Sequence, residues 1–269
     1  MTPGHTRVVA NDIDAAYEAL TGKERILVFT GAGISTESGI PDFRGPQGLW
    51  TRVDPENFTI QKWFANAELR KERWRMHAEG LHWGARSQAR PNRGHLAIAD
   101  LHHAGLLSGV VTQNVDGLHL RSGLPEDAVA EVHGSVRTSS CLDCRNRWET
   151  EEVLRRVDAG EDDPHCPDCG GLIKTDVVMF GEALPLHERD KAWAFLSSSD
   201  SVLVVGSTVS VWPAADVVFR AANLALPIVI VNIGPTDADR FAAVKIDAAA
   251  GEVLPPLVAR LTSRPTMPT

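Results

Sequence analysis

The chain has 269 residues, enough for one large domain or for a large domain with a small one. Its 43% hydrophobic and 23% charged residues are typical of a globular protein, and a formal net charge of −8 argues against general nucleic-acid affinity, which leaves a basic footprint. The sequence shows neither an 18-residue apolar run nor a signal-peptide pattern, so we expect a cytoplasmic protein without membrane contact.

The first predicted elements are a packing helix and a buried strand. Apolar residues at helical spacing predict a helix that begins at Asn11 or Asp12 and ends at Leu20, after a loose terminus over residues 1–10. Ile26–Thr30 is a short β-branched run, typical of a fully buried strand in a parallel sheet. Such a strand is the first sign of an α/β fold.

A glycine turn, Gly31-Ala32-Gly33, follows this strand directly. Its two glycines let the backbone turn tightly and approach a ligand, and the N–H groups that open the next helix offer an anion site. Any doubly wound fold can carry such a turn for structural reasons alone. Here Ser35, Asp42 and Arg44 add more polar groups than a plain loop needs, which favours a diphosphate site.

Residues 45–90 differ in kind from the sheet segments. Gly45-Pro46-Gln47-Gly48 breaks the chain, and aromatic residues are then interleaved with Arg, Lys and Glu. The spacing is helical from Gln61 to Ala78, so we expect a helical insertion over the edge of the sheet. Nucleic-acid stacking sites also interleave aromatic and basic residues, but here glutamates offset the cations and core packing explains the tryptophans.

Polar residues follow the second predicted strand, Gly109–Thr112, which comes after a predicted helix from His95 to His103. Open α/β sheets bind ligands at the carboxyl ends of their strands, and this strand runs into Gln113-Asn114-Val115-Asp116. The polar residues of that stretch could also be ordinary turn formers. Likewise, His133 before Gly134 is either a structural histidine or a general base presented by a loop.

Two Cys-x-x-Cys pairs give the most specific metal signal in the chain. Cys141 and Cys144 form the first pair, and Cys166 and Cys169 form the second, a spacing close to that of zinc ribbons. Four protein thiolates leave no place for water or substrate, so we expect one structural zinc ion that holds a small excursion together. A thioredoxin-like redox pair is the disfavoured alternative, because two pairs occur together.

The remaining chain alternates strands with helices. Val177–Phe180 is predicted to be extended, either as an edge that accepts a peptide by strand addition or as the next core strand. Three further strands and three further helices are then expected: strands 202–205, 227–231 and 244–246, and helices 186–197, 212–223 and 251–261. This alternation predicts a doubly wound parallel sheet, a Rossmann-like α/β fold.

In its ordered set of motifs the chain resembles the sirtuin family over residues 20–262. The motifs that carry this resemblance are Gly31–Arg44, Thr112–His119, His133-Gly134, the two Cys-x-x-Cys pairs, Val177–Glu182, Gly206–Thr208 and Asn232–Gly234. The resemblance implies a Rossmann-like NAD-binding domain made of residues 11–44, 91–134 and 183–262. It also implies a helical insertion at 45–90, a small zinc-binding domain at 135–182, and loose termini at 1–10 and 263–269.

Carried over by motif, the resemblance assigns roles to three sets of residues. Those implied to contact NAD are Gly31, Ala32, Gly33, Ser35, Thr36, Asp42, Phe43, Arg44, Gln113, Asn114, Val115, Asp116, Gly206, Ser207, Thr208, Asn232, Ile233, Gly234 and Ala250. Those implied to pair with the substrate peptide are Val177, Val178, Met179, Phe180, Gly181 and Glu182. The residues implied to be catalytic are His133 and Asn114.

The implied activity is NAD-dependent removal of acyl groups from protein lysines. NAD would be consumed, nicotinamide released and the acyl group passed to ADP-ribose, with His133 activating a ribose hydroxyl. Two other hypotheses are a mono-ADP-ribosyltransferase on the same scaffold and a zinc-ribbon module that binds NAD without turnover. A hydride-transferring dehydrogenase is disfavoured, because the first turn lacks Gly-x-Gly-x-x-Gly.

Departures from the family pattern bear on the substrate. Thr175 stands where sirtuins commonly have proline, and Val209 where they commonly have leucine. Sirtuins that prefer succinyl or malonyl lysine carry a Tyr/Arg pair after the Phe-Arg-Gly segment, and the chain's one tyrosine, Tyr17, precedes it. We therefore expect acidic acyl groups not to be preferred. The amino-acid sequences of the Cys141–Cys144 and Asn232–Thr236 segments are similar to those of the branch that contains a weakly deacetylating mitochondrial sirtuin. Longer acyl groups therefore remain open as substrates.

Overall fold

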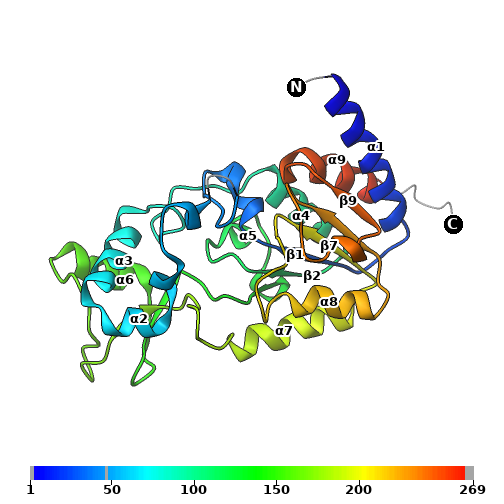
Figure 1. The fold of residues 1–269 in the computed structure, drawn as a ribbon. Coiled ribbons are helices and arrows are strands. Elements are labelled where there is room, and N and C mark those ends of the chain that lie inside the picture. Colours follow the sequence, from blue (N-terminus) through cyan, green and yellow to red (C-terminus); the bar gives the residue numbers. More distant parts are fainter. Residues whose placement is uncertain (1–2, 46–47, 264–269) are drawn as a thin grey trace.

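The structure, a computed structural model, describes residues 3–45 and 48–263 and consists of a large and a small lobe (Figure 1). The large lobe is built on a six-stranded sheet in the order β3-β2-β1-β7-β8-β9. All neighbouring strands of this sheet are parallel. The strands are β1 (Ile26–Thr30), β2 (Leu107–Thr112), β3 (Val129–Glu131), β7 (Ser201–Val205), β8 (Ile228–Val231) and β9 (Val244–Ile246).

Helices cover both faces of this sheet, as the alternation of elements predicts. One face packs on α1 (Pro3–Leu20), α4 (Arg93–His103) and α9 (Ala250–Thr262), and the other on α7 (Leu186–Ser197) and α8 (Asp216–Asn223). Because β1, β7 and β8 are buried on both faces, they consist almost wholly of apolar residues. The predicted doubly wound α/β fold is confirmed.

The chain order reverses beside β1. From β1 the chain builds outward through β2 and β3, then returns to pair β7 with the other side of β1. In open α/β sheets this reversal leaves a crevice at the carboxyl ends of the two central strands, where ligands bind. The turns that leave β1 and β7 begin at Gly31 and Gly206, so both glycines lie at this crevice.

The small lobe is built from two segments of the chain, the helical insertion and the cysteine-bearing segment. Its helices are α2 (Ile60–Ala65), α3 (Ala67–Glu79) and α6 (Thr150–Asp158), and its antiparallel sheet has the order β5-β4-β6. Those strands are β4 (Thr138–Cys141), β5 (Arg147–Glu149) and β6 (Ile173–Thr175). Trp74 of α3 packs in one small core with Leu154 of α6 and Ile173 of β6, and Arg70 pairs with Asp163 at 2.8 Å. The helical and cysteine-bearing segments therefore support each other.

Several local predictions were wrong. α1 begins at Pro3, eight residues before the expected cap at Asn11, so most of the terminus expected to be loose is helical; residues 1–2 and 264–269 lie outside the described part. The turn after β1 continues as a 3₁₀ helix, Ala32–Ser38, and not as an α-helix. The expected helix 61–78 is two helices separated at Asn66, whose side chain caps α3 by accepting from the Leu69 N–H. α8 begins at Asp216, four residues after the expected start at Trp212.

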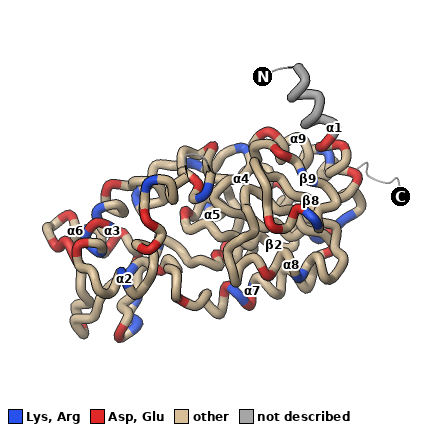
Figure 2. Tube along the Cα trace, viewed as in Figure 1, with Lys and Arg blue, Asp and Glu red and all other residues tan. Residues whose placement is uncertain are grey.

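Two general features of the described residues are the distribution of charge and the length and polarity of the helices. Figure 2 shows Lys and Arg interspersed with Asp and Glu over both lobes. In the part of the chain that the structure describes, every helix is too short or too polar to cross a lipid bilayer.

Candidate active site between the two lobes

A cavity of about 640 Å³ opens at the crevice of the sheet and extends between the lobes. Nearly all of the residues predicted to bind NAD or peptide line this cavity. The predicted residues that line it are Gly31, Ala32, Gly33, Ser35, Asp42, Phe43, Arg44, Gln113, Asn114, Val115, Asp116, His133, Val177, Val178, Met179, Phe180, Gly181, Glu182, Gly206, Ser207, Thr208, Asn232, Ile233 and Gly234. Thr36 and Ala250 do not line it: Thr36 is exposed and bonds to the Gly33 carbonyl, and Ala250 is buried in the first turn of α9.

Three glycines form the floor of the cavity at the ends of β1 and β7. The Gly33 N–H donates to the Gly206 carbonyl at 2.8 Å, and Gly206 has a φ of +60°. A Cβ at Gly33 would lie 2.7 Å from the Gly206 Cα, and a Cβ at Gly31 would lie 2.8 Å from the Gly206 carbonyl oxygen. The two turns can approach this closely only because they lack side chains, which leaves their backbone exposed to a ligand.

A polar cluster stands beside this floor. The buried Asn114 side chain donates to the Gly31 carbonyl at 3.1 Å and to the Ser35 hydroxyl at 3.2 Å, and Ser35 donates to Asp116 at 2.8 Å. Burial raises the pKa of Asp116, while hydrogen bonds from the Leu118 N–H and from Ser35 oppose that shift. The chain of donors fixes the direction of each amide, hydroxyl and carboxylate in the cavity wall.

His133 is presented to the same cavity in a defined tautomer. Its Nδ1 lies 3.0 Å from the Gln113 carbonyl oxygen, which can only accept, so Nδ1 carries the proton and Nε2 keeps its lone pair. Burial lowers the pKa of His133 below its usual 6.5, with the Gln113 hydrogen bond opposing the shift. At neutral pH the imidazole is therefore uncharged and able to accept a proton.

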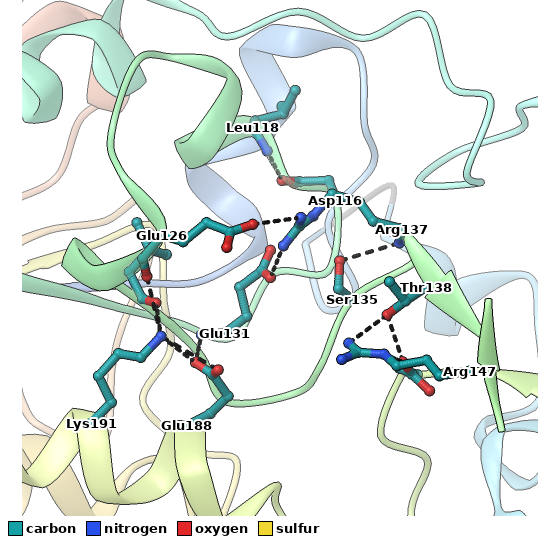
Figure 3. Close-up of polar contacts among 12 residues, drawn as sticks. Asp116, Leu118, Glu126, Glu131, Ser135, Arg137, Thr138, Arg147, Glu188 and Lys191 are labelled. Carbon is teal, nitrogen blue, oxygen red and sulfur yellow. Dashed lines mark hydrogen bonds and ion pairs between the residues drawn. The ribbon is translucent and has the colours of Figure 1, made fainter. Parts of the chain in front are cut away.

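Ion pairs anchor the loop that carries His133 (Figure 3). Arg137 donates to Glu131, at the end of β3, at 2.7 Å, and the Glu131 N–H donates to Glu188 of α7 at 2.9 Å. Lys191 completes the network with a 3.2 Å pair to Glu188. Burial raises the pKa of Glu131, and the Arg137 charge opposes that shift. The network holds both ends of the His133 loop against the sheet and α7.

The predicted peptide segment is extended and stands apart from both sheets. Among the described residues, Val177–Phe180 forms no strand ladder, and Phe180 makes only an isolated bridge to Thr59. The Val178 N–H donates to the His133 carbonyl at 2.8 Å. Glu182 accepts from the Met179 N–H at 2.8 Å and pairs with the buried Lys174 at 3.1 Å. Of the two predicted alternatives, the core strand is therefore wrong.

Some cavity residues were missed by the sequence reasoning. An aromatic wall is formed by Trp50, Phe58 and Trp83 from the 45–90 segment, with Phe43 among them. Arg73 and His77, one helical turn apart on α3, also line the cavity. The helical spacing indicated that α3 packs inward, but not that its inner face borders the site.

The four cysteines meet in the small lobe. Their Sγ atoms all lie within 4.8 Å of one another, with Cys141 and Cys169 3.5 Å apart and Cys144 and Cys166 3.6 Å apart. A tetrahedral ion with Zn–S bonds of about 2.3 Å places its sulfurs roughly 3.8 Å apart, so the cluster fits zinc. His165 stays outside it, with its Nδ1 2.8 Å from the Gly170 carbonyl.

Curated relatives are similar to this chain over most of its length. An NAD-dependent protein deacetylase from Caldivirga maquilingensis is 42% identical over 87% of this chain and 88% of its own length. NAD-dependent protein deacetylase 2 from Streptomyces coelicolor is 41% identical over 89% of this chain and 98% of its own length.

Solved structures agree with this likeness. A Sir2 complex with a deacetylated p53 peptide and 3′-O-acetyl ADP-ribose superposes with a TM-score of 0.83 at 33% identity, covering 92% of this chain and 98% of that one. A Sir2–p53 peptide–NAD+ complex gives 0.77 at 32% identity, covering 93% and 96%. The Sir2 family model matches residues 31–213. The chain belongs to the Sir2 family, the sirtuins that its motifs resemble.

Proposed function

We propose that this protein is an NAD-dependent protein lysine deacylase that passes the acyl group to ADP-ribose and releases nicotinamide. The observation that carries this proposal is the convergence, in one cavity, of a glycine floor, an uncharged His133 and an extended segment at Val177–Phe180. The names of the relatives and the acetyl-ADP-ribose in a similar Sir2 complex support the same chemistry.

The cavity residues fit a dinucleotide. Gly31, Gly33 and Gly206 would border the diphosphate, since a Cβ at any of them would collide with the opposite turn. Asn114 and Asp116 would hold the ribose and the nicotinamide carboxamide, because their cluster fixes both donors and acceptors in place. When bound, NAD supplies the ribose carbon and hydroxyls to which the acyl group moves.

His133 is the proposed general base. Its free Nε2 would take the proton of a ribose hydroxyl, and its Nδ1–H bond to Gln113 would hold the ring in that orientation. The Glu131–Arg137 network keeps the loop in place while the ring changes charge. The extended segment would run beside the backbone of an acyl-lysine peptide, as in strand addition.

Two further features complete the proposal. One structural zinc ion would be held by Cys141, Cys144, Cys166 and Cys169, and such a thiolate site suits a reducing, cytoplasmic environment. We expect protein substrates and no direct nucleic-acid binding, in keeping with a net charge of −8 and with the mixed charges in Figure 2.

The test measures nicotinamide release from adenine-labelled NAD with and without acyl-lysine peptides. A deacylase needs the acylated peptide and leaves the label in a small-molecule product. Release without peptide, with label fixed on protein, would instead establish ADP-ribosyl transfer. A protein that binds NAD but releases no nicotinamide with acetyl, butyryl or glutaryl peptides would contradict the proposal.

The pH dependence should reflect the buried base. Because the pKa of His133 is lowered, the acid limb of kcat/KM for an acyl peptide should have its midpoint below pH 6.5. The measurement is kcat/KM across pH 5–9 in a constant-ionic-strength buffer, with the His133→Ala variant as the control that lacks this acid limb. An acid limb centred above pH 6.5 would contradict the assignment.

A further inference from the structure

The loop that leaves β8 contributes one wall of the cavity. Asn232, Ile233 and Gly234 follow the strand directly, and all three line the cavity. The Asn232 N–H continues the sheet by donating to the Ile246 carbonyl of β9 at 3.1 Å. Beyond that bond the loop leaves the strand ladder, so side-chain contacts hold its backbone in place.

Lys245 of β9 makes two of these contacts. Its ammonium group donates to the Asn232 carbonyl and to the Gly234 carbonyl, each at 2.9 Å. The side chain is partly buried and does not itself line the cavity. Its charge is not used in an ion pair with any carboxylate that the structure describes. Hydrogen bonds from a charged donor are stronger than those between neutral groups, so Lys245 is a firm support for the two carbonyls.

Nearly every other backbone group of the loop also has a partner within the protein. The Asn232 side-chain amide donates to the Ile233 carbonyl at 3.0 Å and to the Gly234 carbonyl at 3.2 Å. The Gly234 N–H donates to Asp247 at 3.2 Å, and Gly234 has a φ of +82°, which favours glycine. Among the described residues, only the Ile233 N–H of this loop is without an acceptor.

The peptide group between Asn232 and Ile233 connects that free donor to Lys245. A trans peptide group is planar, so its C=O and its N–H point in nearly opposite directions. Because the Asn232 carbonyl is turned toward Lys245, the Ile233 N–H is turned away from Lys245. Ile233 is exposed and lines the cavity, so a ligand in the cavity can supply the acceptor that this N–H lacks.

We infer that Lys245 is a positioning residue for NAD, because its two hydrogen bonds hold the loop after β8 with the Ile233 N–H directed at the dinucleotide. This inference rests on the proposed deacylase function and adds a residue that acts without touching the ligand. Removing the ammonium group takes the donor from the Asn232 carbonyl and leaves its peptide group free to turn. Binding then has to order that peptide group, which weakens the affinity for the dinucleotide.

The experiment measures ADP-ribose binding by calorimetry, so it does not depend on turnover. Lys245→Met keeps a side chain of similar length without the charge or the donors, and we expect it to raise the Kd at least tenfold. Lys245→Arg keeps both the charge and the donors, so its Kd should stay within threefold of the wild-type value. Lys23→Met, the same change just before β1 at the opposite end of the sheet, should leave the Kd unchanged.

Steady-state kinetics separates positioning from a general loss of structure. In Lys245→Met the KM for NAD should rise about tenfold, because only the dinucleotide end of the cavity is affected. The KM for the acyl peptide, and kcat at saturating NAD, should stay within twofold of the wild-type values. A loosened protein would instead lower kcat and raise both KM values, and that pattern would overturn the inference.

Ile233→Pro tests the donor itself, because proline has no N–H. If Lys245 acts through this N–H, Lys245→Met should raise the Kd for ADP-ribose less than twofold in the Ile233→Pro background. A full tenfold rise in that background, or an unchanged Kd in Lys245→Met alone, would overturn the inference.

Thermal melting checks that each variant is folded. If Lys245→Met is not, Lys245→Gln replaces it, with an expected rise in Kd of at least fivefold; a smaller rise would overturn the inference. Failure of nicotinamide release with every peptide would count against the deacylase function, whereas the ADP-ribose measurement would still decide the role of Lys245.

Discussion

Replacing His133 with alanine should reduce deacylation by about 10²- to 10⁴-fold, the range that a general base contributes. The substitution removes an imidazole that lines the cavity and keeps the lone pair of its Nε2 at neutral pH. Because the Gln113 carbonyl fixes the ring through Nδ1, the loss should appear mainly in kcat. The measurement is the initial rate of acyl transfer at saturating NAD and peptide.

Exchange of labelled nicotinamide into NAD separates loss of the base from loss of binding. This exchange does not require a hydroxyl proton to be removed, so it should fall much less than deacylation in His133→Ala. His187→Ala is the matched control, because His187 is an exposed histidine on α7 away from the cavity. Equal losses of exchange and deacylation would show that His133 binds the reactants and does not act as the base.

The sheet and most of the cavity could be predicted because they depend on local signals. Apolar runs mark β1, β2, β7 and β8, and each is followed by small or polar residues that a parallel sheet brings to one edge. The short β3 was missed because its three residues give no pattern of their own. Its place is set by pairing with β2 and by the Glu131–Arg137 contact.

The small lobe could be predicted only in part. The spacing of the cysteines indicated the four-cysteine cluster, but β4 (Thr138–Cys141) is polar and its three-stranded sheet follows from tertiary pairing and not from hydrophobic alternation. The position of Arg73 in the cavity wall could not be predicted from the sequence either. Arg70, Arg73 and Arg75 stand close together on one helix, and only the packing of α3 shows that the first is paired, the second faces the cavity and the third is exposed.

Removing the zinc should unfold the small lobe and abolish deacylation. We expect one zinc ion per chain by mass spectrometry, and near zero in Cys169→Ser, because a structural site needs all four thiolates. The small core beside the cysteine cluster contains Cys141, Cys166 and Trp74, and we expect it to bury too few residues to hold without the proposed ion. Thermal unfolding should then show an early transition for the small lobe before that of the six-stranded sheet.

Activity should be lost with the metal although no cysteine lines the cavity. β6 (Ile173–Thr175) pairs with β4 beside Cys141, and the next step along β6 is Lys174, whose pair with Glu182 holds the peptide segment. Loss of the proposed metal should therefore disturb β6, and through β6 the Lys174–Glu182 pair that holds the peptide segment. Cys169→His should retain zinc and activity, since histidine is an ordinary zinc ligand and position 169 is exposed. Full activity and an unchanged melting curve in metal-free Cys169→Ser would show that the cysteine cluster has no structural role.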